Sequence, residues 1–261
     1  MNLGLKGRKA IVSAAASRGL GRASAESLAG EGVDVTIAAR NAETLEAAAA
    51  EMRRTYRVKV TPVAADINTA EGRSRVLAAC PDADILVCNP GVRQVPGDFR
   101  GWEREEWLRW WDDHFFSSMD LIRRVTPGMS ERGFGRVVSI SVSFIKFPQA
   151  GFAHSHAARV ALSGAIASIA RELMPRNVTV NSVCPGLFDT DALHTNWHGH
   201  AKRLGMTYEQ IKEDRLKGCP AGRLADPKEC GDLVAFLCSA QAGFMTGQNI
   251  VNDGGVYQGL F

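Results

Sequence analysis

The sequence predicts an α/β protein with one doubly wound parallel sheet of about seven strands and helices on both faces. Strand-like and helix-like segments alternate along all 261 residues. Nearly every strand-like segment is apolar on both faces, which is typical of parallel strands that are covered by helices. No repeat, low-complexity run or linker interrupts the pattern, so we expect a single domain over residues 1–261. Ligands of such sheets bind beyond the carboxyl ends of the strands, so the loops at those ends are the place to look for a site.

The first strand, turn and helix cover residues 9–32. An apolar run at 10–12 suits a buried strand, and a turn of small residues and a helix follow it. This arrangement places backbone N–H groups and a helix N-terminus against a phosphate. Gly19 and Gly21 would let a pyrophosphate approach the backbone, but Ala15 stands where the dinucleotide motif usually has its first glycine. The motif alone therefore fits both nucleotide binding and an ordinary tight turn.

The remaining elements follow from apolar periodicity and from start and stop signals. The expected strands span 33–40, 58–66, 83–91, 135–143, 178–186 and 248–255, and the expected helices span 41–54, 69–80, 103–126, 155–174 and 226–239. Asn41 and Thr69 are candidate N-caps of two of these helices, and Pro175 ends another. Residues 189–222 are polar and rich in histidine. We expect an irregular substrate lid there, with one helix near Tyr208–Lys217.

Composition and charge exclude several functional classes. Lys and Arg number 31 against 28 Asp and Glu, and the basic residues are dispersed, which gives no case for nucleic acid or for an anionic membrane surface as partner. A membrane-spanning helix needs about 20 consecutive apolar residues, and no apolar run in the sequence approaches that length. The N-terminus leads directly into the first strand, so we expect a cytoplasmic protein without a signal peptide. The six cysteines form no CxxC pair and no metal-ligand spacing, so we expect reduced thiols and no metal site.

Several short motifs follow one another along the chain: ASRGLG at 16–21, AADI at 64–67, CNPG at 88–91, GRVVSIS at 135–141, VTVNSVCPG at 178–186, and GRLADPKECGDLVAFLCS followed by MTGQNIVNDGG within 222–255. In this order and spacing they resemble the short-chain dehydrogenase/reductase family over essentially the whole length. The resemblance is closest to its 3-oxoacyl-carrier-protein-reductase-like branch. It implies a Rossmann-type fold, an NAD(P) cofactor and oxidoreductase activity on a small-molecule carbonyl or alcohol. It also implies a homodimer or homotetramer formed through the long helices near 103–126 and 155–174.

The resemblance further implies a cofactor site. Its expected residues are Ala15, Ser17, Arg18, Gly19, Leu20, Gly21, Arg40, Asp66, Ile67, Asn89, Gly91, Arg159, Pro185, Gly186 and Thr190. Asp66 would meet the adenine, and Asn89 and Gly91 its ribose. NAD-binding proteins place a carboxylate at the end of the second strand, whereas this strand ends at Arg40 with no acid beside it. Arg40 and Arg18 could bind a 2′-phosphate, so we expect NADP(H) in preference to NAD(H). The alternative is that both arginines are solvated loop cations.

All four catalytic positions of the family are changed in this chain. Family members use a Tyr-x-x-x-Lys pair at the start of the second long helix, a serine upstream of it and an asparagine in the preceding long helix. In an ungapped alignment, Ser155 stands at the tyrosine position and Arg159 at the lysine position. Val142, between Ser141 and Ser143, stands at the serine position, and His114 stands at the asparagine position. The three tyrosines of the chain lie elsewhere, so the usual acid is absent.

A replacement proton donor must come from other side chains. The pKa of a serine hydroxyl lies far above that of tyrosine, and arginine keeps its proton, although Arg159 could anchor the nicotinamide ribose. His154 and His156 bracket Ser155, His114 lies one layer behind, and histidine titrates in the useful range. For each histidine the alternative is a residue with no catalytic role. The candidate catalytic residues are Ser155, Arg159, His156, His154, His114, Ser141 and Ser143.

Three hypotheses of function stay open from the sequence. The first is an NADP(H)-dependent oxidoreductase with a rebuilt acid/base, acting on a small carbonyl compound with an apolar part. The second is a non-redox enzyme, such as a lyase, hydrolase or isomerase, because four catalytic positions have changed together. The third is a protein that binds the nucleotide without chemistry. We expect residues around 92–99, 142–152 and 187–200 to line the substrate pocket.

Overall fold

The computed structural model of the protein describes residues 2–91 and 98–260, so part of the expected substrate segment 92–99 lies outside the described residues. Seven parallel strands form one sheet in the order β3-β2-β1-β4-β5-β6-β7. They are β1 (Lys9–Ser13), β2 (Asp34–Ala39), β3 (Val60–Ala64), β4 (Ile85–Cys88), β5 (Gly135–Ile140), β6 (Val178–Pro185) and β7 (Asn249–Asn252). The predicted doubly wound sheet is confirmed. The strand order reverses between β1 and β4, which is where such sheets open a crevice.

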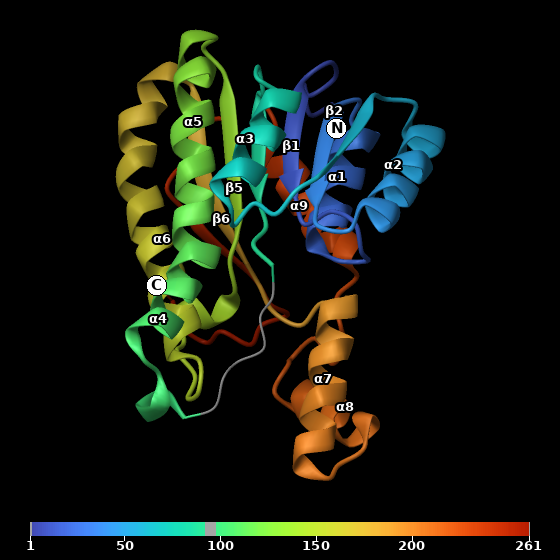
Figure 1. The fold of residues 1–261 in the computed structure, drawn as a ribbon, viewed down its shortest axis with the longest axis vertical. Helices are drawn as coiled ribbons and strands as arrows, with labels where there is room; N and C mark the ends of the chain where they lie inside the picture. Colours follow the sequence, from blue (N-terminus) through green and yellow to red (C-terminus); the bar gives the residue numbers. More distant parts are fainter. Residues whose placement is uncertain (1, 92–97, 261) are drawn as a thin grey trace.

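Helices cover both faces of this sheet (Figure 1). They are α1 (Leu20–Gly30), α2 (Ala42–Tyr56), α3 (Ala70–Ala79), α4 (Arg104–Trp111), α5 (Ser117–Glu131), α6 (Ala153–Leu173), α7 (Asp191–Leu204), α8 (Tyr208–Lys217) and α9 (Pro227–Cys238). Helices α1, α2 and α9 bury one core against the sheet, to which Leu28, Leu45 and Val234 belong. Helices α3, α5 and α6 bury a second core on the other face, to which Leu121 and Leu162 belong.

Local sequence signals account for several helix ends. The side-chain oxygens of Asn41 and Thr69 each accept a backbone N–H of the first turn, at 2.9 and 3.0 Å, so both predicted N-caps are confirmed. Helix α6 ends at Leu173, before Pro175, as predicted. Helix α9 begins with a capping box in which Asp226 and the third residue after it exchange hydrogen bonds.

The first long helix differs from the prediction of one helix over 103–126. The structure contains α4, a π-helical turn at Asp112–Phe116, and then α5, which continues through Pro127 to Glu131. Pro127 should end a helix from propensity alone, but Met129 in the last turn is fully buried. Packing of that turn against the sheet outweighs the hydrogen bond that the proline cannot make.

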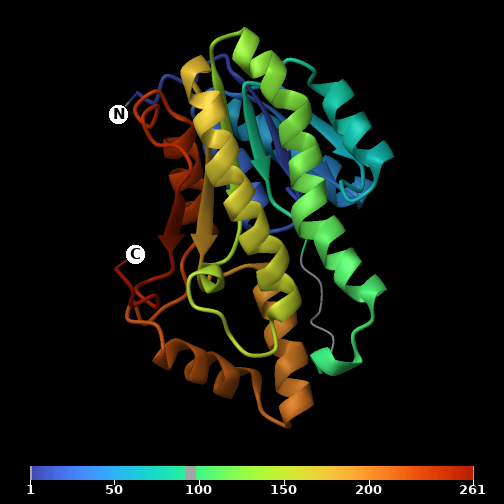
Figure 2. The same ribbon diagram turned by 90° about the vertical axis from the view of Figure 1, so that its left-hand side faces the viewer.

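The expected lid is more regular than predicted. Within 189–222, helix α8 is confirmed, but the prediction of irregular structure was wrong for α7. Thr190 caps α7, and Trp197 and Ala201 are buried against Ile211 of α8. The polar composition of α7 hid this small apolar stripe. The two helices extend as an arm beyond the carboxyl ends of the strands (Figure 2).

Candidate active site

A crevice of about 580 Å³ lies at the carboxyl ends of β1, β2, β3 and β4 and reaches the start of α7. Among the residues expected to contact the cofactor, those that line it are Ser17, Arg18, Gly19, Leu20, Arg40, Asp66, Ile67, Asn89, Gly91 and Thr190. Those that do not line it are Ala15, Gly21, Arg159, Pro185 and Gly186. Sequence reasoning missed Asn41, Thr44 and Asp113, which also line the crevice. The π-helical turn contains Asp113, and no sequence signal marked that turn.

The turn between β1 and α1 leaves backbone groups available to a ligand. Helix α1 starts after Gly19, and none of the described side chains caps its first N–H groups. Ala14 adopts a left-handed conformation, with φ of 52°, which is a strained state for a residue with a side chain. A Cβ on Gly21 would lie 2.4 Å from the carbonyl oxygen of Ala14 and 2.7 Å from Nδ2 of Asn89. Gly21 therefore permits the close approach of α1 to the ends of β1 and β4.

Ser13 ties β1 to β4 at this point. Its Oγ accepts the backbone N–H of Asn89 at 2.8 Å, and its hydroxyl donates to the carbonyl oxygen of Asn89 at 3.2 Å. Ser13 is fully buried, so these hydrogen bonds fix the backbone of Asn89 beside the crevice. The sequence signal that could have identified Ser13 is its position as the polar end of an apolar strand.

The two arginines of the crevice have different surroundings. Arg40 is exposed and forms no ion pair or side-chain hydrogen bond with any described residue. The guanidinium of Arg18 forms an ion pair with Asp189 at 2.5 Å, and its backbone N–H donates to the carboxylate of Asp191 at 3.1 Å. No carboxylate stands at the end of β2, so the positive charge of Arg40 is available to an anion.

The ion pair of Arg18 continues into the arm. Asp189 also contacts His194 Nε2 at 2.6 Å, and His194 Nδ1 lies 2.6 Å from the hydroxyl of Tyr208. The hydrogen bond from Arg18, more than that from His194, holds the pKa of Asp189 below its usual range. This chain of contacts connects the glycine-lined turn to both α7 and α8.

The residues at the Tyr and Lys positions of the family lie together on α6. Arg159 Nε donates to Ser155 Oγ at 3.3 Å, and both side chains are buried, at 8% and 9% exposed. Burial lowers the pKa of Arg159 to about 10, and the nearby Cys184 thiol opposes this shift. Even so, the guanidinium stays charged at neutral pH and cannot act as a proton donor.

The histidines on either side of Ser155 point into different surroundings. His154 is fully buried, with ring centroids 4.3 Å from Trp102 and 4.0 Å from Trp110. Its two ring nitrogens have no hydrogen-bond partner among the described residues, and burial lowers its pKa to about 4. His156 lies instead beside Phe144 and Phe152, with ring centroids 6.4 and 6.1 Å away. Burial, followed by the charge of Arg159, lowers the pKa of His156.

The other candidates are also buried. His114 stacks on Trp110 with ring centroids 5.2 Å apart and lies in the same aromatic cluster as His154. Ser141 and Ser143 are 7% and 2% exposed at the end of β5, on either side of Val142. The Ser141 hydroxyl has no hydrogen-bond partner within the described segments. Trp102, which encloses His154, was not singled out by sequence reasoning because it lies outside the periodic part of the helix.

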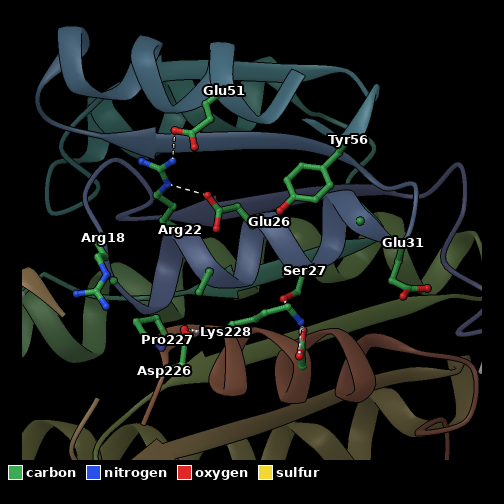
Figure 3. A pocket seen from close by; sticks show the side chains of 14 residues that line it. Arg18, Arg22, Glu26, Ser27, Glu31, Glu51, Tyr56, Asp226, Pro227 and Lys228 are labelled. Carbon is green, nitrogen blue, oxygen red and sulfur yellow. Dashed lines mark hydrogen bonds and ion pairs between the residues drawn. The ribbon is translucent and has the colours of Figure 1, made fainter. Parts of the chain in front are cut away.

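A second hollow adjoins the crevice, between α1, the end of α2 and the start of α9 (Figure 3). Its volume is about 550 Å³, and Arg18 and Gly19 belong to both hollows. Its arginine in the first turn of α1 is already paired: Arg22 contacts Glu26 at 2.8 Å and Glu51 at 2.5 Å (Figure 3). The second hollow therefore offers less to a charged ligand than the crevice does.

Comparisons with known proteins show the family of the chain. A family model described as enoyl-(acyl carrier protein) reductase matches residues 14–257. The chain is 33% identical to the 3-oxoacyl-[acyl-carrier-protein] reductase FabG of Vibrio cholerae over 259 residues, covering 98% of this chain and 99% of the relative. It is 31% identical to human dehydrogenase/reductase SDR family member 4 over 252 residues, covering 95% and 87%. Among solved structures, L-sorbose reductase from Gluconobacter frateurii, complexed with NADPH and L-sorbose, matches with a TM-score of 0.93 and 28% identity over 100% of both chains.

The fold and the crevice define a dinucleotide-binding α/β oxidoreductase. The chain belongs to the short-chain dehydrogenase/reductase family and is an NAD(P)-dependent oxidoreductase. The uncapped start of α1, the glycine-lined turn and the two arginines fit a dinucleotide cofactor. Over residues 2–91 and 98–260, no helix is long and apolar enough to span a membrane. Within the same residues, no cluster of His, Cys, Asp and Glu is arranged to hold a metal ion.

Proposed function

We propose that the protein uses NADP(H), in preference to NAD(H), to interconvert a small carbonyl compound and its alcohol. The observation that carries the proposal is the pair Arg18 and Arg40 in a crevice with no carboxylate at the end of β2. A ribose 2′-phosphate would meet the guanidinium of Arg40, unpaired among the described residues, and that of Arg18, which also contacts Asp189. An unphosphorylated ribose would find no carboxylate at the end of β2 to accept from its 2′-hydroxyl. The NADPH complex of the related L-sorbose reductase supports the same cofactor.

The proposed reaction needs one hydride and one proton. When bound, NADPH supplies the hydride to the carbonyl carbon, and the proton must reach the carbonyl oxygen from this chain. Arg159 keeps its proton, and its Nε–H donates to Ser155 Oγ. Because Ser155 Oγ is the acceptor in this hydrogen bond, its own hydroxyl hydrogen is free to donate to the carbonyl oxygen of the substrate. Serine is too weak an acid to complete the transfer, so we assign the proton to His156.

The surroundings of the two neighbouring histidines support this assignment. His156 faces Phe144 and Phe152, which belong to the segment expected to line the substrate pocket. His154 faces Trp102 and Trp110 instead, which lie outside that segment. His156 therefore supports the role of acid better than His154 does.

Self-association is the second part of the proposal. A hollow of about 530 Å³ lies along α5 and α6. Its apolar lining residues are Phe116, Met119, Ile122, Ile169 and Leu173, and its polar ones are Arg73, Asp120, Arg123, Thr126 and Glu172. Phe116 is 48% exposed in this hollow. The apolar side chains on α5 and α6, with charged residues around them, support a homodimer or homotetramer through these helices.

Replacing Arg40 with glutamine is expected to weaken NADPH binding by about tenfold or more, because a charge-assisted hydrogen bond contributes about 1.5–3 kcal/mol. NADH affinity should be unchanged, since NADH has no 2′-phosphate. Calorimetric titration of both nucleotides into wild type and variant measures the two effects separately.

The variant Asp189→Asn is a control in which NADPH affinity is expected to change in the opposite direction. Removing the charge that holds Arg18 should tighten NADPH binding and leave NADH binding unchanged. Equal losses of NADPH and NADH affinity in Arg40→Gln would contradict the proposed role of Arg40.

A further inference from the structure

The guanidinium of Arg159 is a largely buried positive charge without a counter-ion among the described residues. Its only hydrogen bond within the described chain runs from Nε to Ser155 Oγ, so Nη1 and Nη2 donate to no described residue. The side chain is 8% exposed, and no carboxylate of the described residues forms an ion pair with it. A largely buried and unpaired charge is unfavourable, so this arrangement favours the binding of an anion that the described chain does not provide.

The nearest candidates within the chain do not supply that anion. Cys184 is fully buried, and burial raises the pKa of its thiol to about 12, so the thiol is neutral. Asp253 lies near Cys184, but its carboxylate already accepts the backbone N–H groups of Gly255, Val256 and Tyr257 at 3.0, 3.2 and 2.9 Å. Neither group forms a hydrogen bond or an ion pair with the Arg159 guanidinium in the described chain.

A second cation lies in the same region. Lys146, in the segment after β5, and Arg159 both act on the Cys184 thiol and oppose the rise of its pKa. Lys146 is half-buried and forms no ion pair with any residue that the structure describes. Nε2 of His156, which lies close enough to feel the charge of Arg159, also has no hydrogen-bond partner there. The region around Ser155 therefore contains two cations, Lys146 and Arg159, and a ring nitrogen of His156 that is unpartnered within the part of the chain described.

The bound cofactor would not neutralise this charge. The nicotinamide ribose carries only hydroxyl groups, and the oxidised nicotinamide ring is itself positive. We propose that Arg159 and Lys146 bind the carboxylate of the substrate, which is therefore a short-chain oxo acid. Because Arg159 Nε donates to Ser155 Oγ at 3.3 Å, we expect a carbonyl on Ser155 to lie close to that carboxylate in the substrate. This places the substrate among 2-oxo and 3-oxo acids and the corresponding hydroxy acids.

The oxo acid assignment rests on the proposed oxidoreductase function, but the binding of an anion can be tested without turnover. Calorimetric titrations of the protein in the presence of NADP⁺, which cannot reduce a carbonyl, compare 2-oxobutanoate with the neutral 2-oxobutanamide. The carboxylate is expected to bind about tenfold or more tightly than the amide, as a charge-assisted contact predicts. Equal affinities would overturn the proposal.

Variants identify the residue responsible. Arg159→Met should abolish the preference for the carboxylate and raise the thermal midpoint of the ligand-free protein, because it removes an unpaired buried charge. Arg159→Lys should keep part of the preference. Arg171→Met, which removes an exposed arginine on the same helix, should change neither quantity. A large loss of stability in Arg159→Met, or a preference that survives it, would show that Arg159 has a structural role instead.

The outcomes for the two proposals can be told apart. Binding of NADPH without a preference for the carboxylate would overturn the oxo acid proposal and leave the oxidoreductase proposal standing. A protein that prefers the carboxylate but binds neither nucleotide would overturn the oxidoreductase proposal and leave the binding of a carboxylate standing. Lys146→Met gives a second test, since it should reduce the preference without changing the hydrogen bond between Arg159 and Ser155.

Discussion

Replacing His156 with glutamine is expected to lower the turnover number for carbonyl reduction by about 100-fold, because a positioned general acid contributes about 10²–10⁴-fold. The pH profile should change as well. Burial and Arg159 lower the pKa of His156 below its ordinary value, so its protonated form is populated only in acid. Wild-type reduction should therefore slow as the pH rises through that pKa, and His156→Gln should lose this dependence. Stopped-flow measurement of NADPH oxidation across pH 5 to 8 records both effects.

His154→Phe is the matched control for this experiment. The two ring nitrogens of His154 have no hydrogen-bond partner in the described chain, so a phenyl ring between Trp102 and Trp110 loses no such contact. We expect unchanged turnover and a higher thermal midpoint, since an unsatisfied buried polar group is removed. Full turnover in His156→Gln together with a loss in His154→Phe would reverse the assignment of the acid.

Replacing Gly21 with alanine should destabilise the fold and abolish NADPH binding. The added Cβ would lie 2.4 and 2.6 Å from the carbonyl oxygens of Ala14 and Ser13 and 2.7 Å from Asn89 Nδ2. Two of these three contacts are backbone atoms at the end of β1, so relief requires α1 to move. Overpacking of this kind costs about 1–3 kcal/mol, and the same movement displaces the N–H groups that face the crevice. Chemical denaturation and nucleotide titration measure the two consequences.

Gly19→Ala is the control for Gly21→Ala, because it also replaces a glycine of this turn but introduces no steric clash. Gly19 has φ of −177°, an extended conformation open to any residue, and its added Cβ would find its nearest heavy atom 3.8 Å away. The free energy of unfolding should therefore be close to that of the wild type. A Gly21→Ala protein as stable as Gly19→Ala would contradict the packing role of Gly21.

The alternation of strands and helices was sufficient to predict the sheet, because parallel strands with two buried faces leave a continuous apolar signal. Caps such as Asn41 and Thr69 were also readable, since a cap depends on residues close in sequence. Helix α7 was missed because only Trp197 and Ala201 are buried on an otherwise polar helix. The π-helical turn at Asp112–Phe116 was missed because nothing local distinguishes it from an ordinary helical turn.

The candidate site was predictable where it depends on strand ends. Arg40, Asp66 and Asn89 line the crevice because the carboxyl ends of parallel strands lie at the same edge of the sheet. The surroundings of His154 were not readable, since they depend on Trp102 and Trp110 meeting α6 across the fold. The missing counter-ion of Arg159 was hidden for the same reason, because a pairing across elements is set by tertiary packing.

The most direct test of the account is a calorimetric titration of the wild-type protein with NADPH and with NADH under identical conditions. We expect saturable binding of both, with NADPH tighter by about tenfold or more through Arg18 and Arg40. At about 100 times its Kd, NADPH should also stabilise the fold by about 2.7 kcal/mol. Equal affinity for the two nucleotides, or no binding of either, would contradict the assignment of the crevice to NADP(H).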